Sequence, residues 1–134
     1  MAYMEWDESF SVGVEEIDSQ HKKLIGMVCD FYEGIKGDHN EAFGRLLSSL
    51  LEYAVYHFET EEKYMDQFGY SDTEAHKQEH RAFTEKVLDV KKRFDDGSLV
   101  LSLEITSFLR TWMAGHVRGA DQSYSKCFTD NGLR

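Results

Sequence analysis

The amino-acid sequence predicts an all-α protein, an up-down-up-down antiparallel four-helix bundle with an extended N-terminal arm. Three observations lead to this prediction. The 134-residue chain contains no proline, the residue that most strongly interrupts helices. Four segments place apolar side chains at the three- and four-residue spacing of one helical face. Short polar or glycine-containing stretches separate the segments, and such short connections place successive helices antiparallel to one another.

The N-terminal arm, residues 1–16, shows no helical period. Apolar and polar residues alternate along it, and we expect it to pack over the ends of the bundle. Its apolar members include Trp6, Phe10, Val12 and Val14.

The helical period begins at Ile17 and recurs through the rest of the chain. Gly69 follows the second periodic segment, where a glycine readily takes the left-handed conformation that ends a helix. We expect the whole chain, residues 1–134, to form a single domain. The predicted helices cover about residues 17–36, 41–67, 72–95 and 101–128.

Composition excludes several classes of function. The formal net charge of -10 makes a nucleic-acid role unfavourable, because phosphate backbones are bound by clustered lysine and arginine. No apolar stretch approaches the ~20 residues of a transmembrane helix, so we expect no membrane partner. Cys29 and Cys127 lie far apart and form no metal-binding pair, and the N-terminus does not resemble a signal peptide. We therefore expect a reduced, cytoplasmic setting.

Histidines interrupt the apolar faces of all four predicted helices. Five of the six histidines in the chain lie on these faces. In an up-down bundle, early positions on the first and third helices lie level with late positions on the second and fourth. The histidines satisfy this condition, as do two acidic residues, so we expect one polar layer near one end of the bundle. Its members are His21, His57, Glu61, His76, His80, His116 and Asp121.

The spacing within each helix supports a shared site. His57 and Glu61 are four residues apart, as are His76 and His80, so each pair projects from one helical face. His116 and Asp121 are five residues apart and do not share a face of a regular α-helix. Either Asp121 reaches sideways to the site, or a π-type bulge opens the helix at this point.

Five imidazoles and two carboxylates are more ligands than one ion needs, and they suit two ions bridged by carboxylates. Nitrogen and oxygen ligands in this ratio fit iron, with zinc or manganese also compatible. The Glu-x-x-His pairs of carboxylate-rich di-iron proteins and the His-Glu-x-x-His motif of metalloproteases are both absent.

With these motifs in order, the sequence resembles the bacterial hemerythrins, members of the hemerythrin-like di-iron family. The resemblance covers essentially the whole chain. The matching segments are Trp6–Asp7, Ile17–Leu24, His57–Glu62, His76–His80 and Trp112–His116 followed by Asp121.

The resemblance implies a non-haem di-iron site. His76, His80 and His116 would bind one iron, and His21 and His57 would bind the other, leaving it five-coordinate. Glu61 and Asp121 would bridge the two ions together with an oxo or hydroxo group. Met113, one helical turn before His116, would form a wall of the O2 pocket, whereas Glu62 is expected to be solvated. Trp112 and Tyr124 are expected to flank the ligands or belong to the core.

The function implied by the resemblance is reversible O2 binding by a carrier, store or scavenger, with O2 held as peroxide on the five-coordinate iron. An alternative is a sensor module in which O2 or redox state acts through the N-terminal arm or a partner. A di-iron peroxidase or oxidase ranks third, and we expect no enzymatic activity. Partners beyond O2 would be an electron donor or an O2-consuming protein, and the sequence does not indicate an oligomeric state.

Overall fold

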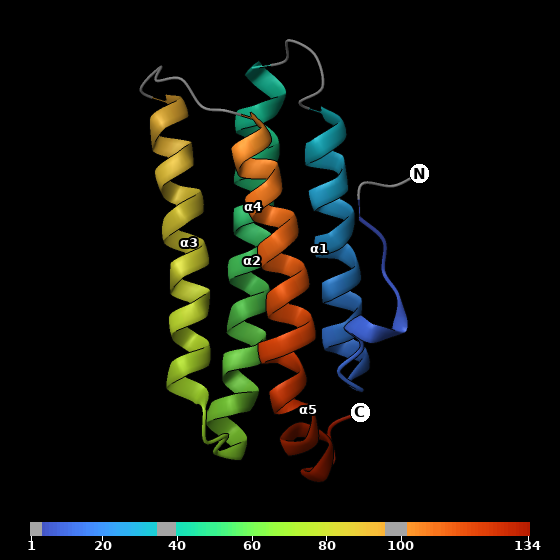
Figure 1. Cartoon of the computed structure of the whole chain (residues 1–134). Helices are drawn as coiled ribbons and strands as arrows, with labels where there is room; N and C mark the ends of the chain where they lie inside the picture. Colours follow the sequence, from blue (N-terminus) through green and yellow to red (C-terminus); the bar gives the residue numbers. More distant parts are fainter. Residues whose placement is uncertain (1–3, 35–39, 96–101) are drawn as a thin grey trace.

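Four long helices lie side by side in the computed structural model, which describes residues 4–34, 40–95 and 102–134. They run alternately down and up, so the predicted four-helix bundle is confirmed (Figure 1). A short 3-10 helix precedes them, and a π-helix interrupts the last one. The elements are η1 (Glu8–Phe10), α1 (Glu15–Gly34), α2 (Asn40–Phe68), α3 (Thr73–Asp95), α4 (Ser102–Gly115), η2 (His116–Ala120) and α5 (Asp121–Asp130).

Most predicted boundaries agree with the structure to within two residues. Helix α1 begins at Glu15 rather than at Ile17, and its first turn carries acidic residues that suit the positive end of the helix dipole. The predicted end of this helix at residue 36 and the predicted start of the fourth at residue 101 lie outside the described residues.

Helix α2 ends at Phe68, and Gly69 follows directly, as the sequence predicts. Gly69 has a φ of 66°, a left-handed value that glycine adopts without steric penalty. The amide of Tyr70 donates back to the carbonyl oxygen of Met65 at 3.0 Å, which satisfies a backbone acceptor that the ending helix would leave unpaired. The chain then turns directly into α3, so that the polar layer of α2 is brought level with the start of α3.

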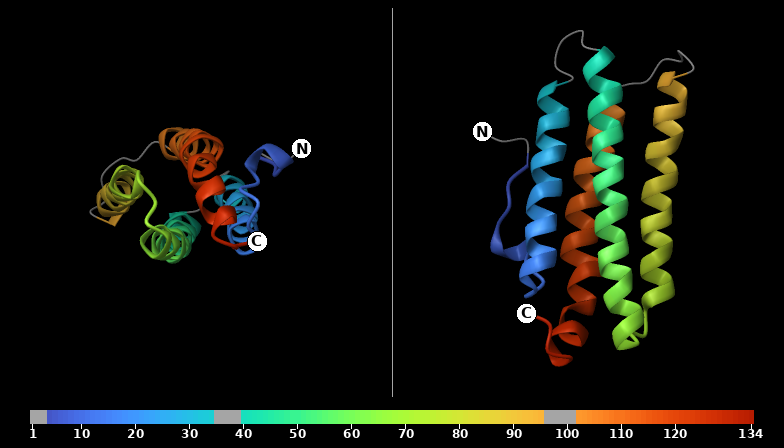
Figure 2. Two further views of the ribbon diagram at one scale, coloured as in Figure 1. Left: turned by 90° about the horizontal axis from the view of Figure 1, so that it is seen from below. Right: turned by 180° about the vertical axis from the view of Figure 1, so that it is seen from behind.

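The helix predicted over residues 101–128 is not regular throughout. Helix α4 gives way at His116 to the π-helix η2, and α5 follows from Asp121 to Asp130. Seen from below, α5 lies under the end of the bundle beside the N-terminal segment (Figure 2). An extra residue in one turn is the physical reason for the break, and its position next to His116 connects it to the polar layer.

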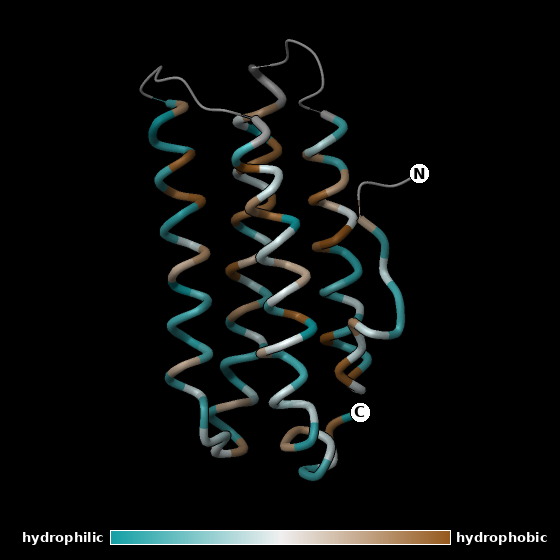
Figure 3. Tube along the Cα trace, in the orientation of Figure 1, coloured by the Kyte–Doolittle hydropathy of each residue, from teal (hydrophilic) through white to brown (hydrophobic). Residues whose placement is uncertain are grey.

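Hydrophobic residues recur at intervals along each helix among more hydrophilic ones (Figure 3). The buried ones form two groups. The main core cluster fills most of the bundle and includes Leu24, Phe58, Phe83, Met113 and Val117. The end cluster closes the lower end of the bundle in the view of Figure 1 and consists of Val12, Val14, Ile17, Met65, Tyr124 and Phe128.

Along the helices, the polar layer lies between the main core cluster and the end cluster. On α1, His21 lies between Ile17 of the end cluster and Leu24 of the main core cluster. On α2, Glu61 lies in the same way between Phe58 and Met65. The polar layer is therefore enclosed by apolar side chains above and below.

The described part of the N-terminal arm, residues 4–14, runs alongside α1 (Figure 1), and its last residues pack into the end of the bundle, as predicted. It is not extended throughout, because residues Glu8–Phe10 form the 3-10 helix η1. Asp18 holds the arm in place by accepting hydrogen bonds from the Val12 amide at 2.9 Å and the Ser11 hydroxyl at 2.6 Å. None of the described helices is both long and apolar enough to cross a membrane.

Candidate metal centre

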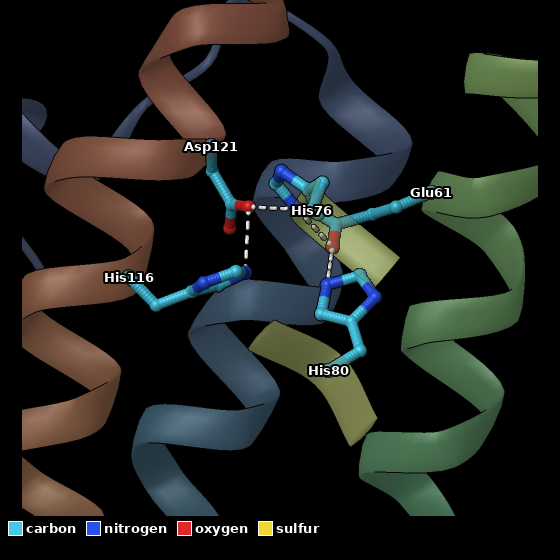
Figure 4. A group of neighbouring side chains, drawn as sticks. All are labelled: Glu61, His76, His80, His116 and Asp121. Atoms are coloured by element: carbon cyan, nitrogen blue, oxygen red, sulfur yellow. Dashed lines mark ion pairs between the residues drawn. The ribbon is translucent and has the colours of Figure 1, made fainter. Parts of the chain in front are cut away.

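The seven predicted ligand residues converge in the interior of the bundle. Helix α1 supplies one of them, α2 and α3 supply two each, and the η2–α5 junction supplies the remaining two. None of the seven is more than 4 % exposed. Figure 4 shows the side chains from α2, α3 and the η2–α5 junction pointing toward one another. They are His21, His57, Glu61, His76, His80, His116 and Asp121.

Their donor atoms fall into two overlapping groups, in each of which the atoms lie within 4.8 Å of one another. We call these the three-histidine position and the two-histidine position. Glu61 and Asp121 belong to both. The three-histidine position also contains His76, His80 and His116, and the two-histidine position also contains His21 and His57.

The two carboxylates are oriented as bridges between the positions. The Oδ1 atom of Asp121 lies 2.9 Å from His76 Nε2, whereas its Oδ2 atom lies 3.0 Å from His21 Nε2. The Oε1 atom of Glu61 lies 3.1 Å from His80 Nε2, and its Oε2 atom lies 3.5 Å from His21 Nε2. The Oε1 atom of Glu61 also lies 3.4 Å from His57 Nε2, so this one oxygen faces histidines of both positions. Each carboxylate is therefore close to histidines of both positions.

The π-helix η2 is what brings Asp121 into the site. The amide of Asp121 donates to the carbonyl of His116, a bond across five residues that defines a π-turn. Both residues consequently face inward, and Asp121 Oδ1 lies 3.0 Å from His116 Nε2. Of the two alternatives that the sequence left open, the π-type bulge is the one that the structure contains.

Most of the inward-facing atoms of this layer lack hydrogen-bond partners within the described part of the chain. Histidine nitrogens and carboxylate oxygens lie close together here, but their angles do not fit a hydrogen bond. A buried polar atom without a partner costs about 1–3 kcal/mol, so several of them in one layer need a ligand that satisfies them together, and cations do so. The unpartnered atoms include the Nε2 atoms of His21, His76, His80 and His116, Oε1 of Glu61 and both oxygens of Asp121.

The outer ring nitrogens of three histidines do have partners. His57 Nδ1 lies 2.6 Å from Gln20 Oε1, and His80 Nδ1 lies 2.9 Å from Glu62 Oε2. His116 Nδ1 lies 3.0 Å from Glu79 Oε1. An Nδ1–H group that donates to these oxygens leaves the Nε2 lone pair facing the site, which is the tautomer that a metal requires.

The expectation that Glu62 is solvated describes only part of its environment, because its side chain is 28 % exposed and also contacts His80. Its side chain leaves the Glu61 face of α2, but it turns toward α3, where His80 meets it. Gln20 and Glu79 were not predicted at all. Each is adjacent in sequence to a ligand residue, Gln20 to His21 and Glu79 to His80, yet each contacts a histidine on a different element. Gln20 and Glu79 could have been predicted from the sequence because each is adjacent to a predicted ligand.

The pKa values of the buried histidines and carboxylates indicate that this layer favours positive charge. Burial opposes protonation of His21 and His76, but contacts with Asp121 and Glu61 outweigh it and raise the pKa of each to about 10. For His57, burial dominates and lowers the pKa. Burial also opposes ionisation of the two carboxylates, but the surrounding histidines hold the pKa of Glu61 and of Asp121 below its ordinary range. The carboxylates thus remain ionised and attract protons, or cations in their place.

Aromatic side chains fix the orientation of the imidazoles. Phe58 stacks on His80 with ring centroids 3.9 Å apart, and Trp112 stacks on His116 at 4.2 Å. The hydroxyl of Tyr124 donates to Glu61 Oε2, and burial keeps the Tyr124 pKa well above its usual value, so this donor stays protonated. Trp112 and Tyr124 therefore flank the histidine–carboxylate layer, whereas the sequence favoured core positions for them; Tyr124 also belongs to the end cluster.

Met113 is buried in the main core cluster, one turn before His116 on α4. Its assignment to the wall of an O2 pocket stays a prediction.

The sequence is similar to a known protein family. The model of the hemerythrin HHE cation binding domain matches residues 12–127. Bacteriohemerythrin of Methylococcus capsulatus is 32% identical over 130 residues, which cover 96% of this chain and 99% of that protein. A hemerythrin-like protein of Naegleria gruberi is 33% identical over 119 residues, covering 89% of this chain and 88% of that protein.

Solved structures extend the similarity to the fold. The crystal structure of a wild-type hemerythrin superimposes with a TM-score of 0.90 at 32% identity, covering 94% of this chain and 98% of that one. A hemerythrin point mutant gives a TM-score of 0.91 at 33% identity, with 95% and 98% covered. The match of the family model, the similarity over nearly the whole chain and the shared fold together show that this chain belongs to the hemerythrin family.

Proposed function

We propose that this protein binds O2 reversibly at a non-haem di-iron centre, as a carrier, store or scavenger. The observation that carries the proposal is the pair of buried donor groups that share Glu61 and Asp121. Histidine nitrogens with carboxylate oxygens suit iron, and most of the inward atoms of the layer lack other partners in the described chain. When bound there, two ferrous ions with an oxo or hydroxo bridge would supply the two electrons that reversible O2 binding needs.

The ligand residues would hold the two ions unequally. His76, His80 and His116 offer three nitrogens at one position, whereas His21 and His57 offer two at the other. Because the two-histidine position has one protein ligand fewer, it is the position left open to a small molecule. Glu61 and Asp121 would tie the two positions together and keep their spacing constant.

The apolar surroundings would protect the bound gas from water and protons. The main core cluster and the end cluster enclose the ligand layer from both sides, and His21 and His57 are almost completely buried. A dry pocket favours release of O2 unchanged over its release as a reduced species. Met113 would contribute an apolar wall to this pocket, and we propose no peroxidase or oxidase activity.

A specific contact supports the second candidate, an O2 or redox sensor. Arg118, within η2, donates to the Ser9 hydroxyl at 2.7 Å and to Asp7 at 3.1 Å, and both partners lie in the N-terminal arm. Gln122 of α5 donates to the carbonyl of Ser11 at 2.9 Å. The arm is therefore tied to the segment that carries His116 and Asp121, so a shift of that segment would reach the arm.

Iron analysis of single variants tests the ligand assignment. Wild-type protein reconstituted with ferrous iron should hold two ions per chain, and His57→Ala and Glu61→Ala should each hold fewer. Glu59→Ala, which alters an exposed carboxylate on the same helix, should keep both ions. Full iron occupancy in the His57 and Glu61 variants would refute the assignment.

The sensor is distinguished from the carrier by the arm itself. A sensor should change the hydrogen-exchange protection of the arm between the reduced and oxygenated forms. A carrier should oxygenate and deoxygenate repeatedly with that protection unchanged.

A further inference from the structure

The two metal positions differ in the charge that supports their histidines from behind. At the three-histidine position, His80 and His116 each contact a carboxylate, Glu62 and Glu79 respectively. At the two-histidine position, His57 contacts the neutral amide of Gln20. The Nδ1 atom of the fully buried His21 has no hydrogen-bond partner among the described residues.

The shared ligands do not cancel this difference. Glu61 and Asp121 belong to both donor groups, and each lies close to histidines of both positions. Their negative charge is therefore divided between the positions. The outer carboxylates are not divided, since both Glu62 and Glu79 contact histidines of the same group.

The outer partners of the two positions also differ in their exposure to solvent. Glu62 and His80 line a surface cavity of about 410 Å³, and Glu79 and His76 line another of about 280 Å³. The side chain of Glu62 is 28 % exposed and that of Glu79 is 48 % exposed, so both outer carboxylates reach the surface. Gln20, by contrast, is buried, and its amide nitrogen lies 3.4 Å from the hydroxyl of Thr60.

A carboxylate that accepts from the outer N–H of an imidazole makes the inner nitrogen a stronger electron donor. The added negative charge stabilises a trivalent ion more than a divalent one, because the Coulomb energy grows with the charge of the ion. A neutral amide orients the ring without adding that charge. The position with the two outer carboxylates should hold a ferric ion more strongly.

We propose that Glu62 and Glu79 are positioning residues that make the three-histidine position the stronger ferric site, whereas Gln20 leaves the two-histidine position the more easily reduced. This inference rests on the proposed di-iron function. It assigns the two irons different reduction potentials, with the three-histidine iron reduced at the lower one. The iron that is open to O2 is then the first to become ferrous when an electron donor restores the oxidised protein.

The test is a reductive titration of the iron-loaded protein, followed by its visible spectrum, after iron content has been measured in every variant. Wild type should be reduced in two separate one-electron steps. Glu62→Gln and Glu79→Gln should each raise the midpoint potential of the lower step. Gln20→Glu should lower the midpoint of the higher step and bring the two closer together. Glu59→Gln, which removes an exposed charge beside the same cavity, should leave both steps in place.

Zinc binding to the metal-free variants provides a second readout that does not depend on redox chemistry. Loss of such an outer partner weakens metal binding by about 10- to 100-fold, so Glu62→Gln and Glu79→Gln should weaken one of the two zinc equivalents and spare the other.

This inference would be overturned if Glu62→Gln and Glu79→Gln each bound two irons and kept both reduction midpoints unchanged. The proposed function would then remain intact. Equal shifts of both steps, or equal weakening of both zinc equivalents, would also overturn this inference. Failure of the wild type to bind two irons would instead overturn the proposed function.

Discussion

Replacing Tyr124 with phenylalanine removes a hydroxyl that contacts the ligand layer from the end cluster. The Tyr124 hydroxyl donates to Glu61 Oε2, and both side chains are fully buried. A hydrogen bond to a charged group contributes about 1.5–3 kcal/mol, and its loss leaves a buried carboxylate oxygen without its donor. The ring itself would keep its packing, because phenylalanine retains the stacking on Phe128 at 4.3 Å. We therefore expect the metal-free Tyr124→Phe variant to lose about 1.5–3 kcal/mol of unfolding free energy.

The assay is urea unfolding of the metal-free protein, with Tyr64→Phe as a matched control. Tyr64 also donates to a glutamate, Glu16, but that contact is exposed to solvent. Water replaces an exposed hydrogen bond, so the control should lose less than about 0.5 kcal/mol. Equal losses in the two variants, or no loss in Tyr124→Phe, would refute the reasoning that burial of the Glu61 contact sets its strength. Bound metal should reduce the Tyr124→Phe effect, since the ion would also engage Glu61.

Three further predictions concern the metal-free protein and the ends of its elements. Arg118→Met should lower the unfolding free energy by less than about 1 kcal/mol, because its contact with Asp7 is solvent-exposed; added salt should shrink the difference, and a loss that grows with salt would contradict the assignment. Gly69→Ala should lower the unfolding free energy by about 1–2 kcal/mol, because alanine is strained at a φ of 66° even though its Cβ would meet no neighbouring atom. An unchanged melting temperature would show that the turn relaxes. The pKa of His21 and of His76 is raised from 6.5 to about 10, against the opposing effect of burial, by the two buried carboxylates. The stability that these histidines contribute is fully present below pH 6.5 and is lost as the pH rises toward 10; constant stability across that window in chelator-treated protein would contradict the shift.

The helices and the ligand layer could be predicted because their signals are periodic and local. Ile17, His21 and Leu24 share a helical face wherever the helix is placed, and all three are buried. The level of each ligand along its helix followed from chain direction alone. The convergence of His21, Glu61 and Asp121 was therefore accessible without coordinates.

The π-turn and the outer partners were less accessible, each for a physical reason. A spacing of five residues shows that Asp121 leaves the face of His116, but it does not show whether the side chain or the backbone adjusts. The contact of Glu62 with His80 depends on how α2 and α3 rotate against each other, and the sequence of α2 alone does not determine that rotation. The η1 turn depends similarly on Asp7, whose carboxylate accepts from the Ser9 amide at 2.8 Å.

The central claim is that two bridged irons in this layer bind O2 reversibly, and repeated gas exchange on the reduced, iron-loaded protein tests it most directly. Exposure to O2 should produce a visible absorption band, and removal of O2 should abolish it without added reductant, through several cycles. A protein that holds two irons yet is oxidised irreversibly at the first exposure would contradict the claim.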